Sequence, residues 1–250
     1  MMKVLAIIQA RMSSERLPQK VLKEINGKPM LMHIIDRIKR SKYIDEIVVA
    51  TTTQAMDDMI EEALCNYGVG LYRGNIYNVL DRFYQCAKKY GAQYIVRLTA
   101  DNPLIDVDLI DKGISQLVMD GNNYDYVALK EGYPLGLGVE VFTFGALKEC
   151  YENATQSYEK EHVTPYIYCH EDRFNIKYIS NKDDYSELRL TCDTPEDFEL
   201  IKNIYSYFGE KKYFSMSEIV EYIKRHPELM NINKEIRQKN FKQSDVRGWK

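Results

Sequence analysis

A group of basic and hydroxyl side chains follows the first apolar run of the chain. Residues 4–8, VLAII, are rich in β-branched side chains, which at this length predicts a strand buried on both faces. The polar side chains come within the next twelve residues: Gln9, Arg11, Ser13, Ser14, Arg16 and Lys20. A loop of this kind at the carboxyl end of a central strand offers backbone N–H groups and cations to a polyphosphate. A solvated basic loop without a ligand is the alternative at this point.

Two aspartates follow other predicted strands. Asp101 comes shortly after an apolar run at 94–98, which places it on the same sheet edge as the basic loop. Asp193 follows a short apolar run at 188–192 and comes directly before TPED, a strong helix start. Mg²⁺ bridging two carboxylates and phosphate oxygens is the usual way to hold a nucleoside triphosphate. The residues therefore predict a phosphate loop with Asp101 and Asp193 near it, although a solvated loop carboxylate is an equally ordinary outcome for either one.

Strands and helices alternate over the first 120 residues. Apolar runs typical of strands cover 4–8, 47–51, 70–72 and 94–98, and apolar residues at helical spacing cover 30–38, 57–64 and 79–87. This alternation predicts an α/β fold with a mostly parallel sheet covered by helices. Asp106 or Asp108 is expected to cap the next helix, which carries Ile110 and Ile114.

The pattern changes after about residue 120. We expect strands at 124–129, 174–179 and 188–192, an alternating strand that ends at 142, a helix to about 154, and helices after Thr194 and Ser215. The loop EGYPLGLGVEVF is punctuated by glycines, which let a backbone approach a ligand closely. Helical spacing would place His162 and Tyr166 on one face, with a purely structural histidine as the alternative. The polar stretch after residue 231 either packs on another surface or frays.

Composition excludes several classes of protein. The 250 residues are 45% hydrophobic with a formal net charge of −3, which suits a globular α/β protein and argues against a general nucleic-acid binder. Five scattered cysteines without a CxxC pair indicate neither a zinc ribbon nor a disulfide framework, and we expect reduced thiols. No apolar run approaches the ~20 residues of a membrane span. We therefore predict a cytoplasmic protein with no membrane and no nucleic-acid partner.

Motifs of other nucleotide and hydrolytic enzymes are missing from the sequence. There is no G-x-x-x-x-G-K-[ST] and no G-x-G-x-x-G after a strand, which disfavours P-loop enzymes and dinucleotide enzymes. A G-x-S-x-G elbow is absent as well, so a Ser/His/Asp triad has little support.

Several motifs in order resemble one enzyme family. IIQARMSSERLPQKVLKEINGKPML resembles the opening of the cytidylyltransferases that make CMP-sialic acid and CMP-ketodeoxyoctonate, and TADNPLID, GLGVEVF, EKEHVTPYI and TCDTPEDFELI are similar to the branch called spore coat polysaccharide biosynthesis protein F. The resemblance covers residues 3–208. It implies a doubly wound, mostly parallel, Rossmann-like sheet of the nucleotide-diphospho-sugar transferase type. It further implies one nucleotidyltransferase domain over 1–250, with 125–185 as a small insertion for substrate binding and dimerisation and 228–250 as a C-terminal tail.

The resemblance also implies roles for individual residues. Nucleotide contacts fall on Ala10, Arg11, Ser13, Ser14, Arg16, Lys20, Thr99 and Asp101. The catalytic set is Lys20, Arg16, Asp101 and Asp193, of which the two aspartates would hold the cofactor Mg²⁺. Gly136, Glu140, His162 and Tyr166 fall where relatives bind the sugar. Ser13 and Gln19 replace glycines of the family pattern, which would alter how closely the phosphates approach without removing a charge.

The implied reaction is attack by a sugar oxygen on the α-phosphorus of CTP, giving a CMP-sugar and pyrophosphate. The expected partners are CTP, an acidic or amino sugar such as a nonulosonic acid of a surface glycan, and a second copy of the chain in a homodimer. Three alternatives stay open: a GTP- or UTP-dependent sugar-1-phosphate nucleotidyltransferase, a glycosyltransferase using Asp106-Val107-Asp108 as a D-x-D metal site, and a non-catalytic protein that retains the fold.

Overall fold

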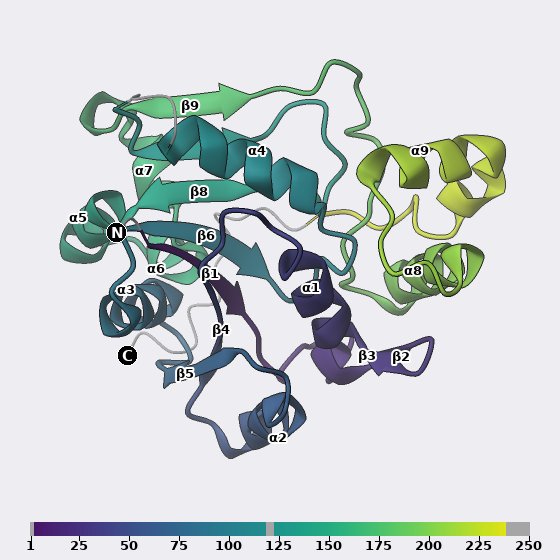
Figure 1. The fold of residues 1–250 in the computed structure, drawn as a ribbon, viewed down its shortest axis with the longest axis horizontal. Helices are drawn as coiled ribbons and strands as arrows, with labels where there is room; N and C mark the ends of the chain where they lie inside the picture. Colours follow the sequence, from purple (N-terminus) through teal and green to yellow (C-terminus); the bar gives the residue numbers. More distant parts are fainter. Residues whose placement is uncertain (1–2, 119–122, 239–250) are drawn as a thin grey trace.

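A twisted, mostly parallel sheet forms the centre of the molecule (Figure 1). The computed structural model describes residues 3–118 and 123–238, and within them the sheet has seven strands in the order β5-β4-β1-β6-β8-β7-β9. Their bounds are Val4–Gln9 (β1), Glu46–Thr52 (β4), Gly70–Gly74 (β5), Tyr94–Thr99 (β6), Tyr126–Leu129 (β7), Glu140–Thr143 (β8) and Ile176–Ile179 (β9). Strand β1 pairs in parallel with β4 and β6, whereas β8 runs antiparallel to both β6 and β7. The predicted α/β class with a mostly parallel sheet is confirmed.

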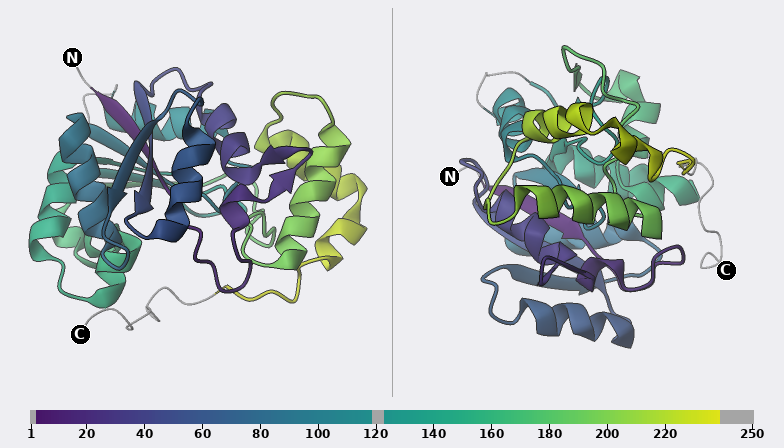
Figure 2. Two further views of the ribbon diagram at one scale, coloured as in Figure 1. Left: turned by 90° about the horizontal axis from the view of Figure 1, so that it is seen from below. Right: turned by 90° about the vertical axis from the view of Figure 1, so that its right-hand side faces the viewer.

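Helices cover both faces of this sheet, as expected for a doubly wound fold. The helices are Met30–Ile38 (α1), Asp58–Leu64 (α2), Val79–Tyr90 (α3), Val107–Val118 (α4), Phe144–Asn153 (α5), Ser157–His162 (α6), Pro165–Cys169 (α7), Pro195–Phe208 (α8) and Met216–Arg225 (α9). Side chains of α1, α2 and α4 pack in one apolar core with β1, and those of α3, α5 and α7 pack in a second core on the other face. Helices α8 and α9 lie together to one side of the sheet (Figure 2) and join the first core.

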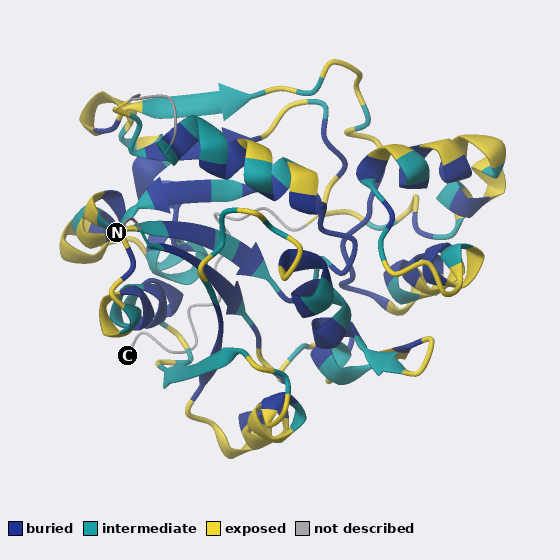
Figure 3. Ribbon diagram, viewed as in Figure 1, coloured by how far each residue is buried: buried dark blue, intermediate teal, exposed yellow. Residues whose placement is uncertain are grey.

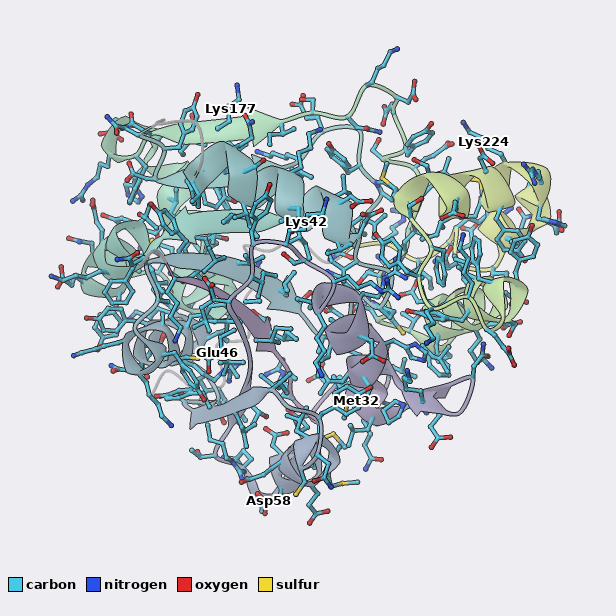
Figure 4. All side chains as sticks on the ribbon, viewed as in Figure 1. Met32, Lys42, Glu46, Asp58, Lys177 and Lys224 are labelled. Atoms are coloured by element: carbon cyan, nitrogen blue, oxygen red, sulfur yellow. The ribbon has the colours of Figure 1, made fainter. Side chains whose placement is uncertain are left out.

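Burial follows this layering. Figure 3 shows dark-blue, buried backbone along the central strands and exposed segments on the outer helices and loops. Residues Leu5, Ala6, Ile7 and Ile8 of β1 are fully buried, because helices cover both faces of that strand. Charged side chains labelled at the rim of Figure 4, such as Asp58 on α2 and Lys224 on α9, extend away from the core.

A tight turn and several helix caps match their sequence signals. Asn26 and Gly27 both have positive φ and join two-residue strands Glu24–Ile25 (β2) and Lys28–Pro29 (β3), the geometry that an Asn-Gly turn favours. Thr194 caps α8 and Ser215 caps α9, each in a capping box. Of the two candidates for the cap of α4, Asp106 holds the position, because its carboxylate accepts from the backbone N–H of Asp108 at 2.8 Å.

Two sequence-based predictions are wrong. The stretch at 188–192 makes an isolated parallel bridge between Leu135 and Arg189 instead of a regular strand. The expected single helix through His162 and Tyr166 is broken into α6 and α7, so these side chains do not share a face of one helix. Two features end α6: the positive φ of Val163 (72°), and Pro165, which lacks a backbone N–H.

Candidate active site

The basic loop that follows β1 is held at its start by a buried carboxylate. The backbone N–H of Met12 donates to Asp57 Oδ1 at 2.8 Å, and the side-chain hydroxyl of Thr52 donates to the same carboxylate. Asp57 is only 2% exposed, and these donors satisfy its buried carboxylate oxygens. The sequence predicted Asp57 as a helix start; its role in anchoring the loop could not be found from spacing, because Met12 is 45 residues away.

The loop returns on itself before Lys20. The backbone N–H of Gln19 donates to Met12 O at 3.2 Å, and that of Leu17 donates to Ser14 Oγ at 3.4 Å. Gln19 has a left-handed backbone (φ 59°, ψ 21°), and a short 3-10 turn, Lys20–Leu22, follows it. The family pattern has glycine at the position of Gln19. The backbone of Gln19 has a left-handed conformation that glycine adopts without strain.

Lys20 lies at the centre of the site. Its Nζ donates to Asp193 Oδ1 at 2.8 Å and to Cys192 O at 3.0 Å, and it lies 3.4 Å from Asp101 Oδ2. Arg16 Nη2 contacts the other oxygen of Asp193, Oδ2, at 3.1 Å. The structure therefore brings together the four residues predicted as catalytic, from the basic loop, the carboxyl end of β6 and the segment before α8.

The opposite charges of Lys20 and Asp193 each stabilise the ionised form of the other. Burial alone would lower the pKa of Lys20, but the charges of Asp101 and Asp193 outweigh burial and raise that pKa above its ordinary value. Burial alone would raise the pKa of Asp193, but Lys20, Arg16 and Arg189 outweigh it and lower that pKa. Both directions favour the ionised forms, so Lys20 is a cation and Asp193 an anion at neutral pH.

Backbone contacts join the two aspartate segments directly. The N–H of Cys192 donates to Asp101 O at 2.7 Å, so the residue before Asp193 is tied to the end of the β6 segment. The hydroxyl of Thr99 donates to the Asp101 carboxylate and accepts from Asn102 Nδ2 at 2.9 Å. Thr99, predicted to contact the nucleotide, is thus placed beside Asp101 and orients it.

The donor chemistry of Asp101 and Asp193 fits a magnesium ion. Mg²⁺ usually takes one or two carboxylates, substrate phosphates and water as ligands, so a pair of aspartates at a phosphate-binding edge matches its needs. In residues 3–118 and 123–238, no group of three or more His, Cys, Asp and Glu side chains is arranged to hold a metal ion. The fit therefore depends on phosphate oxygens that would arrive with a nucleotide.

The remaining loop residues lie around this centre. Arg11 and Ser13 are exposed, Ser14 is half-buried and Ala10 is buried. Arg82 of α3 is 2% exposed, and burial and the nearby charge of Arg11 lower its pKa to about 10. This second cation near Arg11 was missed by the sequence analysis, because helical spacing made Arg82 a member of an amphipathic helix.

A second polar cluster lies on the neighbouring strands β6 and β8. Arg97 and Glu140, paired in register across these strands, form an ion pair. Glu140 also accepts from the Tyr126 hydroxyl and from Thr164 Oγ1 at 2.7 Å. Burial would raise the pKa of Glu140, but Arg97 and the two hydroxyls outweigh it and lower that pKa. Glu140 was predicted to bind sugar; Arg97 was read as part of a strand.

The other three predicted sugar residues are placed differently. Gly136 has φ 102°, and a Cβ there would lie 2.6 Å from the backbone N of Thr191, so this glycine allows two backbone segments to pack closely. Tyr166 is buried, and its hydroxyl accepts from Arg173 Nη1 at 2.6 Å. His162 is half-buried at the end of α6. The contacts of Gly136 and Tyr166 described above are with Thr191 and Arg173 rather than with Lys20.

Comparison with known proteins identifies the family. The family model described as cytidylyltransferase matches residues 5–218. The chain belongs to the cytidylyltransferase family. The match includes the basic loop, Asp101 and Asp193, which are the parts of the site described above.

Individual family members are similar over most or part of the chain. Spore coat polysaccharide biosynthesis protein SpsF of Bacillus subtilis is 34% identical over 232 residues, covering 90% of this chain and 95% of that protein. A 3-deoxy-manno-octulosonate cytidylyltransferase of Geobacter sulfurreducens is 38% identical over 118 residues, 46% of each chain. The solved structure of a cytidylyltransferase from Leptospira borgpetersenii has a TM-score of 0.88 at 33% identity, covering 96% of this chain and 100% of that one. The resemblance read from the motifs is confirmed.

Among the helices in the described part of the chain, none is both long and apolar enough to cross a membrane.

Proposed function

We propose that this protein transfers the cytidylyl group of CTP to a hydroxyl of a sugar, releasing pyrophosphate. The observation that carries the proposal is Lys20, whose Nζ contacts both Asp193 and Asp101 at the carboxyl edge of β1 and β6. This edge of an open α/β sheet is where ligands bind, and membership in the cytidylyltransferase family supplies the reaction class.

The chain's own residues position and neutralise the triphosphate. A bond forms between the sugar oxygen and the α-phosphorus, the bond from that phosphorus to the β-phosphate oxygen breaks with its electron pair on pyrophosphate, and the hydroxyl proton passes to solvent. Lys20 and Arg16 would stabilise the charge that grows on the departing pyrophosphate. Exposed Arg11 and backbone N–H groups of the loop would bind the other phosphate oxygens.

Asp101 and Asp193 would hold Mg²⁺ when the nucleotide binds. The ion would neutralise phosphate charge and favour the ionised form of the attacking hydroxyl. The carboxylates already lie among the cations that would contact the phosphates, so metal and nucleotide binding are expected to strengthen each other.

The proposed acceptor is an acidic or amino sugar of a surface glycan, such as a nonulosonic acid. Two relatives support this class: the Bacillus protein is a spore coat polysaccharide biosynthesis protein, and the Geobacter protein is a 3-deoxy-manno-octulosonate cytidylyltransferase. Glu140, His162 and Tyr166 are the proposed sugar side of the site. A homodimer paired through 125–185, the division of the chain into one domain with a C-terminal tail at 228–250, and a cytoplasmic location stay predictions.

The D-x-D motif on which the glycosyltransferase alternative depends has a structural role in this fold. In the structure Asp106 is 3% exposed, caps α4 and accepts from the backbone N–H of Met216, so the D-x-D at 106–108 is explained by structure. A GTP- or UTP-dependent reaction on a sugar 1-phosphate stays the alternative proposal.

The test is pyrophosphate release with CTP, GTP, UTP and ATP, in the presence of Mg²⁺, against nonulosonic acids and sugar 1-phosphates. The proposal expects release with CTP and an acidic sugar. Release with GTP or UTP and a sugar 1-phosphate, with none from CTP, would replace it by the alternative.

A further inference from the structure

Arg189 is a third cation on the carboxylate of Asp193, and it differs from Lys20 and Arg16. Its Nη2 lies 3.2 Å from Asp193 Oδ2, while Nε and Nη2 each donate at 2.8 Å to the two oxygens of Asp197. Such a bidentate pair fixes the guanidinium in orientation as well as in place. Asp197 is fully buried and also accepts from the backbone N–H of Asp193 at 2.9 Å. Arg189 and Asp197 thus hold both the side chain and the backbone of Asp193.

Residues after α9 complete this support. Asn233, 4% exposed, donates through Nδ2 to Arg189 O at 3.0 Å and to Asp197 Oδ1 at 2.9 Å. Gln238 Oε1 accepts from Arg189 Nη1 at 2.8 Å. In Figure 2 the yellow segment that follows α9 runs beside α8, which begins with the turn that carries Asp197. The match to the family model ends at residue 218, so Asn233 and Gln238 lie beyond it.

The three cations that contact Asp193 differ in how far each could move toward a bound nucleotide. Among the described residues, the linked ion pairs contain three cations, Arg16, Lys20 and Arg189, and three carboxylates, Asp101, Asp193 and Asp197. A bound triphosphate would draw Lys20 and Arg16 toward its own oxygens. Arg189 is bound on both sides by Asp197 and Gln238 and its side chain is 8% exposed, so it cannot follow.

We infer that Asn233 and Gln238 are positioning residues for the reaction: through Arg189 and Asp197 they hold Asp193 in place when Lys20 and Arg16 engage the nucleotide. The segment at 232–238 is therefore a part of the active site's support that the chain supplies after its family-matched region. The expected effect on the reaction rate rests on the proposed function. The expected effect on the position of the Asp193 side chain does not depend on that function.

The experiment compares Asn233→Ala, Asn233→Asp and Gln238→Ala with the wild type and with Glu235→Ala, an exposed neighbour on the same segment. Steady-state pyrophosphate release gives kcat and KM, thermal unfolding reports folding, and crystal structures of the ligand-free proteins report Asp193. A misplacement of about 1 Å can cost on the order of 10² in rate, so we expect kcat to fall at least about tenfold in Asn233→Ala, with KM for CTP within about threefold.

Asn233→Asp separates positioning from packing. It keeps the volume of the side chain, but it replaces two donated hydrogen bonds by a carboxylate beside Asp197, so we expect a fall in kcat at least as large as that of the alanine variant. A role in packing alone predicts a less stable Asn233→Asp protein whose folded form keeps the kcat and the Lys20–Asp193 contact of the wild type. Gln238 is exposed, so Gln238→Ala should fold even if the Asn233 variants do not, and we expect a fall of about threefold.

The structures give the answer if no substrate is turned over. We expect the contact of 2.8 Å between Asp193 Oδ1 and Lys20 Nζ to be lost or lengthened in the Asn233 variants and kept in Glu235→Ala. A silent wild type with a displaced Asp193 in the variants would contradict the proposed function and support the positioning role. Folded variants with Asp193 unmoved, or with kcat within twofold of wild type, would overturn the positioning role.

Discussion

Two groups of charged side chains, one at the carboxyl edge of the central sheet and one within its strands, are built differently. In the first, Lys20 contacts Asp101 and Asp193, and Arg16 contacts Asp193, and all four residues lie outside the strands. In the second, Arg97 and Glu140 lie within β6 and β8, opposite each other in the sheet register.

The difference is in what each group can do. Lys20 shares its charge between two carboxylates, and the Arg16 side chain is 31% exposed, so a ligand's phosphates could replace these contacts without moving a strand. Glu140 has Arg97, Tyr126 and Thr164 as partners, and moving it would disturb the sheet. We therefore assign the first group to the chemistry and the second to stability, with Glu140 also on the proposed sugar side of the site.

The largest expected effect is on the first group. Lys20→Ala removes the cation shared by Asp101 and Asp193, and we expect kcat for pyrophosphate release to fall by on the order of 10² or more, the scale of losing one preorganised donor. Arg16 and Arg189 remain on Asp193, so the loss of stability should be smaller than for the second group. Lys23→Ala, three residues along, is the control, and near-normal turnover in Lys20→Ala would contradict the assignment.

The second group is expected to respond in stability. Glu140→Gln leaves the Arg97 guanidinium without its counter-charge, with side chains of the pair only 15% and 20% exposed, and we expect the free energy of unfolding to fall by about 3 kcal/mol. Denaturant unfolding measures this change. The control is Glu152→Gln, whose partner Lys148 is on an exposed helix face and whose loss should cost no more than about 0.5 kcal/mol. Equal costs for the two variants would remove the contrast between the groups.

The smallest expected effect concerns the loop that carries Lys20. Gln19 has a left-handed backbone, which costs a residue with a Cβ roughly 1 kcal/mol or more, so Gln19→Gly should raise the free energy of unfolding by about 0.5 to 1 kcal/mol. Gln54→Gly is the matched control, because Gln54 is extended and glycine there should destabilise the protein. A destabilised Gln19→Gly variant would show that the loop needs the glutamine side chain for another reason.

Much of the fold and the central residues of the site could be predicted from the sequence. Continuous apolar runs placed the mostly buried strands β1, β4 and β6, and a shorter run placed the half-buried edge strand β5. The helix starts at Thr194 and Ser215 are local signals, and each residue caps its helix in a capping box. Lys20, Asp101 and Asp193 were predicted to meet because each follows a strand or precedes a helix at one sheet edge.

The residues that support this centre could not be predicted in the same way. Asp57 holds Met12 across 45 residues, and Asn233 holds Arg189 across 44, so neither contact leaves a trace in local spacing. The break between α6 and α7 depends on Val163, a β-branched residue at positive φ that the periodicity of 158–167 conceals. Long-range contacts of this kind are decided by tertiary packing.

Calorimetric titration of CTP into wild-type protein and Lys20→Ala, with Mg²⁺ present, tests the central claim most directly, because it needs no knowledge of the sugar. A hydrogen bond to a charged group contributes about 1.5–3 kcal/mol, so the account predicts that CTP binds the wild type and binds Lys20→Ala at least about tenfold more weakly. Equal affinity for the two proteins, or no binding of CTP to the wild type, would contradict it.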